Sequence, residues 1–80
     1  MPEHIISLPQ LDIELGFAAS CIEGMAREMN CSYRDVVARM KRTGMLKNFI
    51  LPYYEQLHTE SREHVTEIAM DYLKKEEAKS

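Results

Sequence analysis

The 80-residue chain has no tryptophan and only three glycines, three prolines and two cysteines. So few glycines and prolines, with an ordinary apolar content, exclude a low-complexity chain and argue against disorder and a turn-rich β fold. Cys21 and Cys31 stand ten residues apart with no CxxC pair. This spacing excludes the common zinc-knuckle and dithiol redox motifs, so we expect two reduced thiols.

Long apolar runs are also missing. No window approaches the roughly 18 apolar residues that a membrane helix needs. The N-terminus has neither the basic start nor the apolar centre of a signal peptide, so we expect a cytoplasmic protein with no membrane contact. A chain of 80 residues can build one core. We predict a single helical domain over residues 1–80, with an ordered core at about 10–75 and flexible ends.

Charge is unevenly distributed along the chain, although the net charge is only −3. Residues 1–31 hold five acids and one base, residues 32–50 hold five bases and one acid, and residues 51–80 hold seven acids and four bases. The acidic total argues against a dedicated nucleic-acid binder. The basic middle still leaves a local anion-binding face open.

Apolar residues recur at helical spacing in four segments, at about 11–29, 33–43, 46–57 and after the polar turn 59–61. The inward positions of the first segment include Leu11, Leu15, Ala18, Ile22, Met25, Ala26 and Met29, and those of the last include Val65, Ile68, Ala69, Tyr72 and Leu73. No strand alternation or repeat is present. We therefore predict an all-α fold, a compact bundle of four helices.

The second segment has the clearest limits. Ser32 followed by Asp35 resembles a capping box, and Gly44 stands where a helix ends in the left-handed conformation. Tyr33, Val36, Val37 and Met40 are its expected inward residues. In the third segment Pro52 predicts a break near Asn48–Pro52, because proline lacks a backbone donor and disfavours helical geometry in the residue before it.

Two glycines, Gly16 and Gly24, lie inside the first predicted helix, where each costs about 1 kcal/mol relative to alanine. They indicate either a close approach by a neighbouring backbone or simple tolerance. The sequence leaves both open.

Catalytic motifs are missing from the chain. His58 and His64 have no HExxH-type spacing, the serines and cysteines have no local motif, and no glycine-rich phosphate loop occurs. We expect no enzyme activity, no cofactor and no metal. The structural interpretation of Leu57-His58-Thr59 is a helix end, with His58 donating to a terminal carbonyl and Thr59 capping the next turn.

The segment 43–59 contains more apolar side chains than one amphipathic stripe needs, and the five methionines after residue 24 add adaptable groups that are common at interfaces or in cores. We expect some of these side chains to form an exposed patch for a protein partner or a second copy. The predicted partner-binding residues are Phe49, Tyr53, Tyr54, Leu57 and His58. A possible second contact is the anion or nucleic-acid face Arg34, Arg39, Lys41 and Arg42.

An alternative function is a small helix-turn-helix DNA-binding regulator. Residues 25–40 fit that unit, with Ala26 at the helix crossing, Asn30 in the turn where glycine is usual, and Cys31 after it. The second helix would then present Tyr33, Arg34, Arg39 and Arg42 to DNA. Any two amphipathic helices joined by a capped turn give the same pattern.

The order of these features resembles a family of short bacterial all-helical proteins of unknown function with a KKTG…YYxxLHT core. Here that core reads Lys41-Arg42-Thr43-Gly44, then Tyr53-Tyr54 and Leu57-His58-Thr59. Glu60-Ser61 stands where a glycine is common. The resemblance implies a helical fold and carries no catalytic residue to this chain. The genes of such proteins often lie beside genes for ADP-ribosyltransferase-like toxins. The resemblance therefore implies that this chain is an antitoxin-like or accessory partner of a protein encoded by a neighbouring gene.

Overall fold

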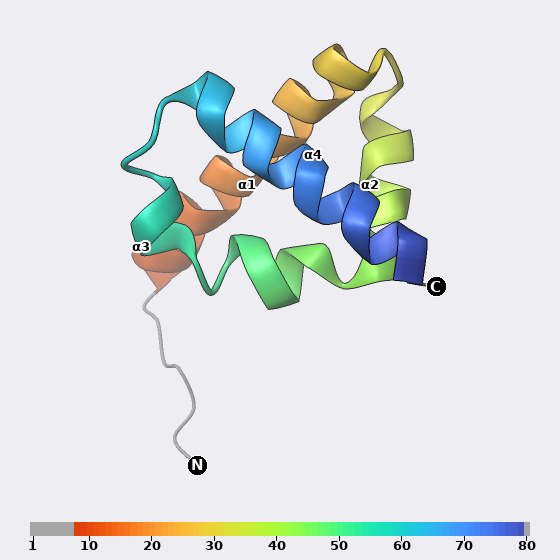
Figure 1. The fold of residues 1–80 in the computed structure, drawn as a ribbon. Helices are drawn as coiled ribbons and strands as arrows, with labels where there is room; N and C mark the ends of the chain where they lie inside the picture. Colours follow the sequence, from red (N-terminus) through yellow and green to blue (C-terminus); the bar gives the residue numbers. More distant parts are fainter. Residues whose placement is uncertain (1–7, 80) are drawn as a thin grey trace.

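The computed structural model describes residues 8–79, which form five helical elements and the turns between them (Figure 1). In chain order these are α1 (Leu8–Met29), α2 (Tyr33–Thr43), the π-helical turn η1 (Leu46–Ile50), α3 (Tyr54–Leu57) and α4 (Arg62–Lys79). The all-α prediction is confirmed for these residues, but they form five helices and not four. None of the helices in residues 8–79 has the length and apolar character needed to cross a membrane.

The first helix begins earlier than the sequence predicted, at Leu8 and not near Leu11. Pro9 lies within its first turn, where backbone N–H groups have no helical acceptor, so proline is tolerated there. The helix ends at Met29, and the next residue, Asn30, has a φ of +54°. The Cys31 N–H donates to the Ala26 carbonyl at 3.0 Å and the Asn30 N–H to the Arg27 carbonyl at 3.3 Å, which is a Schellman motif.

Both predicted ends of α2 are confirmed. The Ser32 hydroxyl accepts a hydrogen bond from the Asp35 backbone N–H at 3.0 Å. At the other end Gly44 is left-handed, with φ +69°, and its N–H donates to the carbonyls of Met40 and Lys41. Tyr33 departs from the predicted inward stripe, since its side chain is 44% exposed.

The third segment breaks at Pro52, as predicted. The Leu51 N–H donates to the Leu46 carbonyl at 3.0 Å, five residues back, which closes η1. Residues 51–53 form turns, and α3 then adds a single short helix. One predicted helix over 46–57 is therefore two elements with different directions (Figure 1).

Ser61 caps α4, with its hydroxyl accepting from the His64 backbone N–H at 3.1 Å. The expected capping role of Thr59 is wrong, because the Thr59 hydroxyl donates back to the Gln56 carbonyl at 2.9 Å. The helix then continues to Lys79, although the sequence predicted a fraying end after about residue 75. The predicted flexible N-terminus lies outside the described residues.

An ion pair joins α2 to the last turn of α4. Arg39 donates from Nε to Glu77 Oε2 at 2.6 Å and from Nη2 to Oε1 at 2.7 Å. This two-point contact spans 38 residues of sequence, so helix periodicity does not reveal it. It holds the last turn of α4 against α2, and the hydrogen bond from Arg39 keeps the pKa of the Glu77 carboxyl below its ordinary value.

We expect Glu77→Gln to destabilise the fold by about 1 kcal/mol or less at pH 7, because the pair is partly exposed to solvent. A depressed folded-state pKa stabilises the protein above the unfolded-state pKa, and that stabilisation is lost as the pH falls through the folded-state value. The difference between wild type and Glu77→Gln should therefore be full above about pH 5 and shrink toward pH 2. Urea unfolding at several pH values measures it. Glu67→Gln, an exposed change on the same helix, should show a smaller effect, and equal effects would contradict the assignment.

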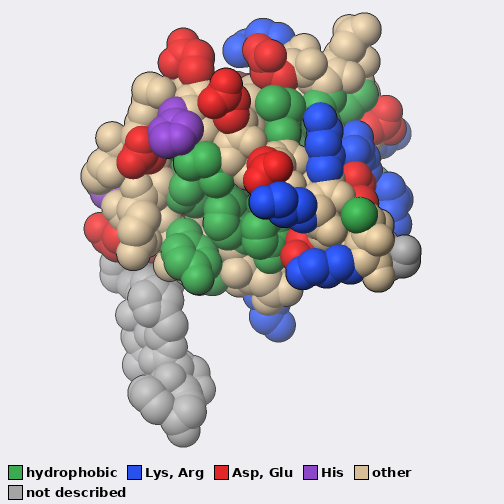
Figure 2. Space-filling model, viewed as in Figure 1, with side chains coloured by type: hydrophobic (Ala, Val, Ile, Leu, Met, Phe, Trp, Pro, Cys, Tyr) green, Lys and Arg blue, Asp and Glu red, His purple; other side chains and the backbone are tan. Residues whose placement is uncertain are grey.

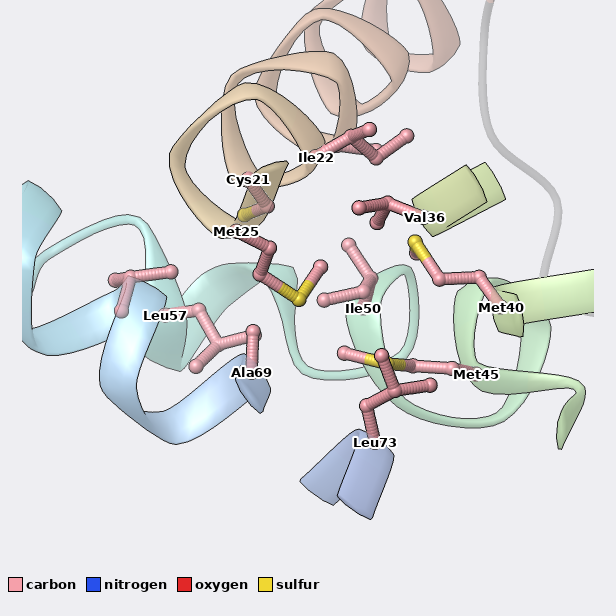
Figure 3. Packing of buried hydrophobic residues seen from close by; sticks show 12 residues of the cluster. Cys21, Ile22, Met25, Val36, Met40, Met45, Ile50, Leu57, Ala69 and Leu73 are labelled. Carbon is pink, nitrogen blue, oxygen red and sulfur yellow. The ribbon is translucent and has the colours of Figure 1, made fainter. Parts of the chain in front are cut away.

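The core lies where α1, α2 and α4 meet over η1 (Figure 3). The five largest side chains that are less than 2% exposed are Met25, Val36, Met45, Ile50 and Leu73. Three of the methionines, Met25, Met40 and Met45, thus belong to the core. Glu14, expected outside the stripe, is also buried, and it accepts a hydrogen bond from the Gln10 amide at 2.8 Å.

Gly24 lies at a close contact between α1 and α4. A Cβ atom built on Gly24 would lie 2.5 Å from Oγ1 of Thr66, which is buried on α4. Around Gly16 no atom of residues 8–79 beyond the adjoining backbone of α1 lies within 4 Å of such a Cβ. A neighbouring helix therefore approaches Gly24 closely, but through a side chain and not through its backbone as predicted, and the interpretation of tolerance holds for Gly16.

Candidate functional site

The candidate site lies in the segment 46–57, because its apolar side chains are found in three environments, namely the core, the partly buried boundary and the solvent-exposed surface. Ile50 points into the core and is fully buried, while Tyr53 is 50% exposed. Phe49 lies between them, partly buried. The short elements η1 and α3, with the turn between them, turn successive apolar residues to different sides. A single regular helix would place them on one stripe.

Three rings form a surface cluster between this segment and α4. The Phe49 ring stacks on the Tyr72 ring, with centroids 4.2 Å apart and planes 9° from parallel. Tyr53 adds to it at 5.5 Å from Phe49. We call Phe49, Tyr53 and Tyr72 the aromatic cluster. Figure 2 shows hydrophobic side chains gathered between α4 and the segment below it, with acidic groups at one margin and a mixture of basic and acidic groups at the other.

The other predicted partner-binding residues lie apart from this cluster. Tyr54 stacks on His58, with centroids 4.7 Å apart, and meets the edge of Phe17 from α1 at 5.3 Å. Leu57 is inside the core, 6% exposed, so it fixes α3 in place and offers no accessible surface. His58 is exposed, with Nε2 3.7 Å from a carboxylate oxygen of Glu55. The structure thus separates the five predicted residues into two ring groups and one core residue. Tyr72 is the member that the sequence analysis had placed in a helix stripe.

The predicted basic face is also divided. Arg39 is committed to Glu77 on α4. Arg34, Lys41 and Arg42 are exposed and share one side of α2, because they occupy positions i, i+7 and i+8. Three of the four residues therefore remain as a basic stripe.

Next to this stripe lies an apolar groove that the sequence analysis missed. It has a volume of about 300 Å³, and α1, α2, η1 and the turns at the ends of η1 form its walls. The lining residues, which define the α1–α2–η1 groove, are Ile22, Val37, Met40, Lys41, Gly44, Leu46, Lys47 and Leu51. The signal in the sequence that indicates such a groove is the high apolar content of residues 46–51. These residues include one core residue, one residue of the aromatic cluster and several residues that line the groove.

A second hollow, of about 210 Å³, brings Ser20, Cys21, His58 and Arg62 together between α1, the turn after α3, and α4. Burial raises the pKa of the Cys21 thiol to about 11, so the thiol stays protonated at neutral pH and is a weak nucleophile. Within residues 8–79, no three or more His, Cys, Asp or Glu side chains gather closely enough to hold a metal ion.

Comparison with known protein families identifies a related family. The model of a family described as "Protein of unknown function (DUF3791)" matches residues 16–76. That span contains the aromatic cluster, the basic stripe and the groove. No curated protein and no solved structure matches the chain.

Proposed function

The chain belongs to this DUF3791 family of proteins of unknown function, and we propose that it is a non-enzymatic protein–protein interaction module acting in the cytoplasm. The observation that carries the proposal is the aromatic cluster. Its Tyr53 ring is half exposed on top of a stacked pair that joins η1 to α4. Rings held in this way lose little conformational entropy when a partner covers them, and tyrosine is enriched among residues that dominate binding energies.

The arrangement around the cluster supports the same function. Phe49 and Tyr72 are partly buried against the core, so their positions are set before any partner arrives. Preorganised contacts lower the cost of binding. Charged groups at the margins of the patch would set the orientation and the association rate more than the affinity.

The resemblance to toxin-associated proteins adds a specific partner to the proposal. The chain would bind an ADP-ribosyltransferase-like protein encoded by an adjacent gene, as an antitoxin-like or accessory protein. A second copy of the chain is the other candidate partner for the same cluster.

The test is affinity capture of the tagged full chain from cells of its own species, with nuclease present, followed by mass spectrometry. We expect one protein in stoichiometric amount, or the untagged copy of the chain itself. The Tyr53→Ala variant should no longer capture this partner. Tyr33→Ala is the matched control, because Tyr33 is similarly exposed and none of the ring contacts among residues 8–79 involves it. A partner retained equally by both variants would contradict the proposed site.

A DNA-binding function is a second candidate, favoured by the turn between α1 and α2. Asn30 takes the left-handed conformation that the helix-turn-helix unit requires of its turn residue, and Arg34, Lys41 and Arg42 face outward on the following helix. This candidate predicts DNA binding that weakens steeply with salt and is lost in Arg34→Glu plus Arg42→Glu. Binding that is insensitive to these changes would exclude it.

A further inference from the structure

We propose that the α1–α2–η1 groove is a second docking site, which takes the apolar side chains of an amphipathic helix with acidic residues along one flank. This site is distinct from the aromatic cluster and does not depend on the function proposed for it. The two surfaces share only the segment 46–53, where Leu46 and Leu51 line the groove and Phe49 and Tyr53 belong to the cluster.

The shape of the groove favours side chains of a larger body over a free small molecule. Its volume of about 300 Å³ is about twice that of an engineered cavity of roughly 150 Å³ that binds benzene, so it has room for two large apolar groups. It is open to solvent along one side. A small ligand usually needs 70–90% of its surface covered, which an open groove does not provide.

An apolar track continues beyond the groove along α1. Leu15 is 43% exposed and stands seven residues before Ile22, which lines the groove. Seven residues are two helical turns, so the two side chains share a face of α1 about 10 Å apart. This length matches the spacing of anchor residues at i and i+7 on a partner helix. An elongated partner is therefore a better fit than a compact one.

Charge specifies the partner further. Two of the eight lining residues are lysines, Lys41 and Lys47, and no lining residue is acidic. Arg42 is exposed on α2 beside Lys41. On the opposite wall α1 carries the exposed Glu23, next to Ile22. The acidic residues of the partner helix must then lie on the flank that faces α2 and η1, where the lysines neutralise their charge. The apolar residues of the partner must fill the groove between α1 and the α2–η1 wall.

The test is selection from a displayed library of helical peptides about 18 residues long, with random surface positions, against the folded full chain. We expect enriched peptides to carry two or three apolar residues at i, i+4 or i+7 and Asp or Glu along one flank. Amide signals of Val37, Leu46 and Leu51 should shift on titration with such a peptide. Enrichment of no peptide, of peptides without acids, or of peptides that shift signals elsewhere would overturn the proposal.

Two double variants test whether the lysine charges of the groove contribute to peptide binding without a change in the fold. Lys41→Gln plus Lys47→Gln changes two exposed side chains and should weaken the selected peptides about tenfold or more, with the helical circular dichroism unchanged. Lys74→Gln plus Lys75→Gln removes the same charge from exposed positions on α4 and should leave the affinity unchanged. Equal effects of the two pairs would overturn the assignment of the lysines.

Two further experiments test whether the groove binds a small amphiphile or a second copy of the chain instead of a partner helix. Sodium octanoate at millimolar concentration should not shift the groove signals. A saturable shift would assign the groove to a small amphiphile and overturn the proposal. The chain should form no dimer that depends on Lys41 and Lys47. A dimer that the double lysine variant dissociates and Tyr53→Ala does not would assign the groove to a second copy of the chain and overturn the proposal. If the aromatic cluster alone proves to bind no partner, the groove proposal still stands.

Discussion

Leu73→Ala should lower the free energy of unfolding by about 2–5 kcal/mol, which makes it one of the two most damaging changes we predict. Leu73 is fully buried on α4 and points at Met45 in the centre of the core (Figure 3). Truncation removes buried methyl groups and leaves a cavity that neighbouring helices close only in part. A small domain has about 5–15 kcal/mol of stability in total, so the variant should stand near its folding threshold.

Urea unfolding followed by circular dichroism measures the effect of Leu73→Ala. The matched control is Leu15→Ala, the same substitution at a side chain that is 43% exposed on α1. We expect the control to cost less than about 1 kcal/mol, since much of that side chain stays in water in the folded state. Similar losses at the two positions would mean that α4 does not pack against the core in this register.

Gly24→Leu should destabilise the protein by about 3 kcal/mol, even after the gain in helix propensity over glycine is subtracted. The first added atom would lie 2.5 Å from Thr66 Oγ1. Thr66 cannot move freely, because its hydroxyl donates to the Arg62 carbonyl at 3.0 Å and its side chain is buried. The remaining leucine atoms would therefore force α1 and α4 apart along the largest contact in the fold.

Gly16→Leu is the control for Gly24→Leu, with the same substitution in the same helix. Within the described part of the chain, no atom beyond the adjoining backbone of α1 lies within 4 Å of a Cβ at Gly16, so the change should stabilise the protein by up to about 1 kcal/mol through helix propensity. Thermal unfolding of the two variants provides the comparison. Destabilisation by both, or by neither, would contradict the crossing of α1 and α4 at Gly24.

Local signals in the sequence predicted much of this fold. Ser32 and Gly44 end α2 as their chemistry requires, and Pro52 interrupts the third segment. The stripe in α4 is confirmed, with Val65, Ala69 and Leu73 buried and its other two members partly buried. These features depend on residues a few positions apart, which is the range over which caps and helix periodicity act.

Contacts between distant segments could not be predicted in the same way. The Arg39–Glu77 pair joins residues 38 positions apart, and it removes one of the four residues expected to face an anion. Leu57 and Tyr53 stand four residues apart and were assigned to one surface. The turn after η1 sends Leu57 into the core and Tyr53 to solvent. The groove depends on three elements meeting, so only its apolar residues were visible beforehand.

The affinity of the captured partner for wild type, Tyr53→Ala and Tyr33→Ala tests the central claim most directly. Titration calorimetry with purified proteins should show a dissociation constant raised about tenfold or more by Tyr53→Ala, as for an anchor residue, and unchanged by Tyr33→Ala. Both variants should unfold at the same urea concentration as wild type. Equal affinities of all three proteins, or an affinity lost only together with stability, would contradict an interaction site at the aromatic cluster.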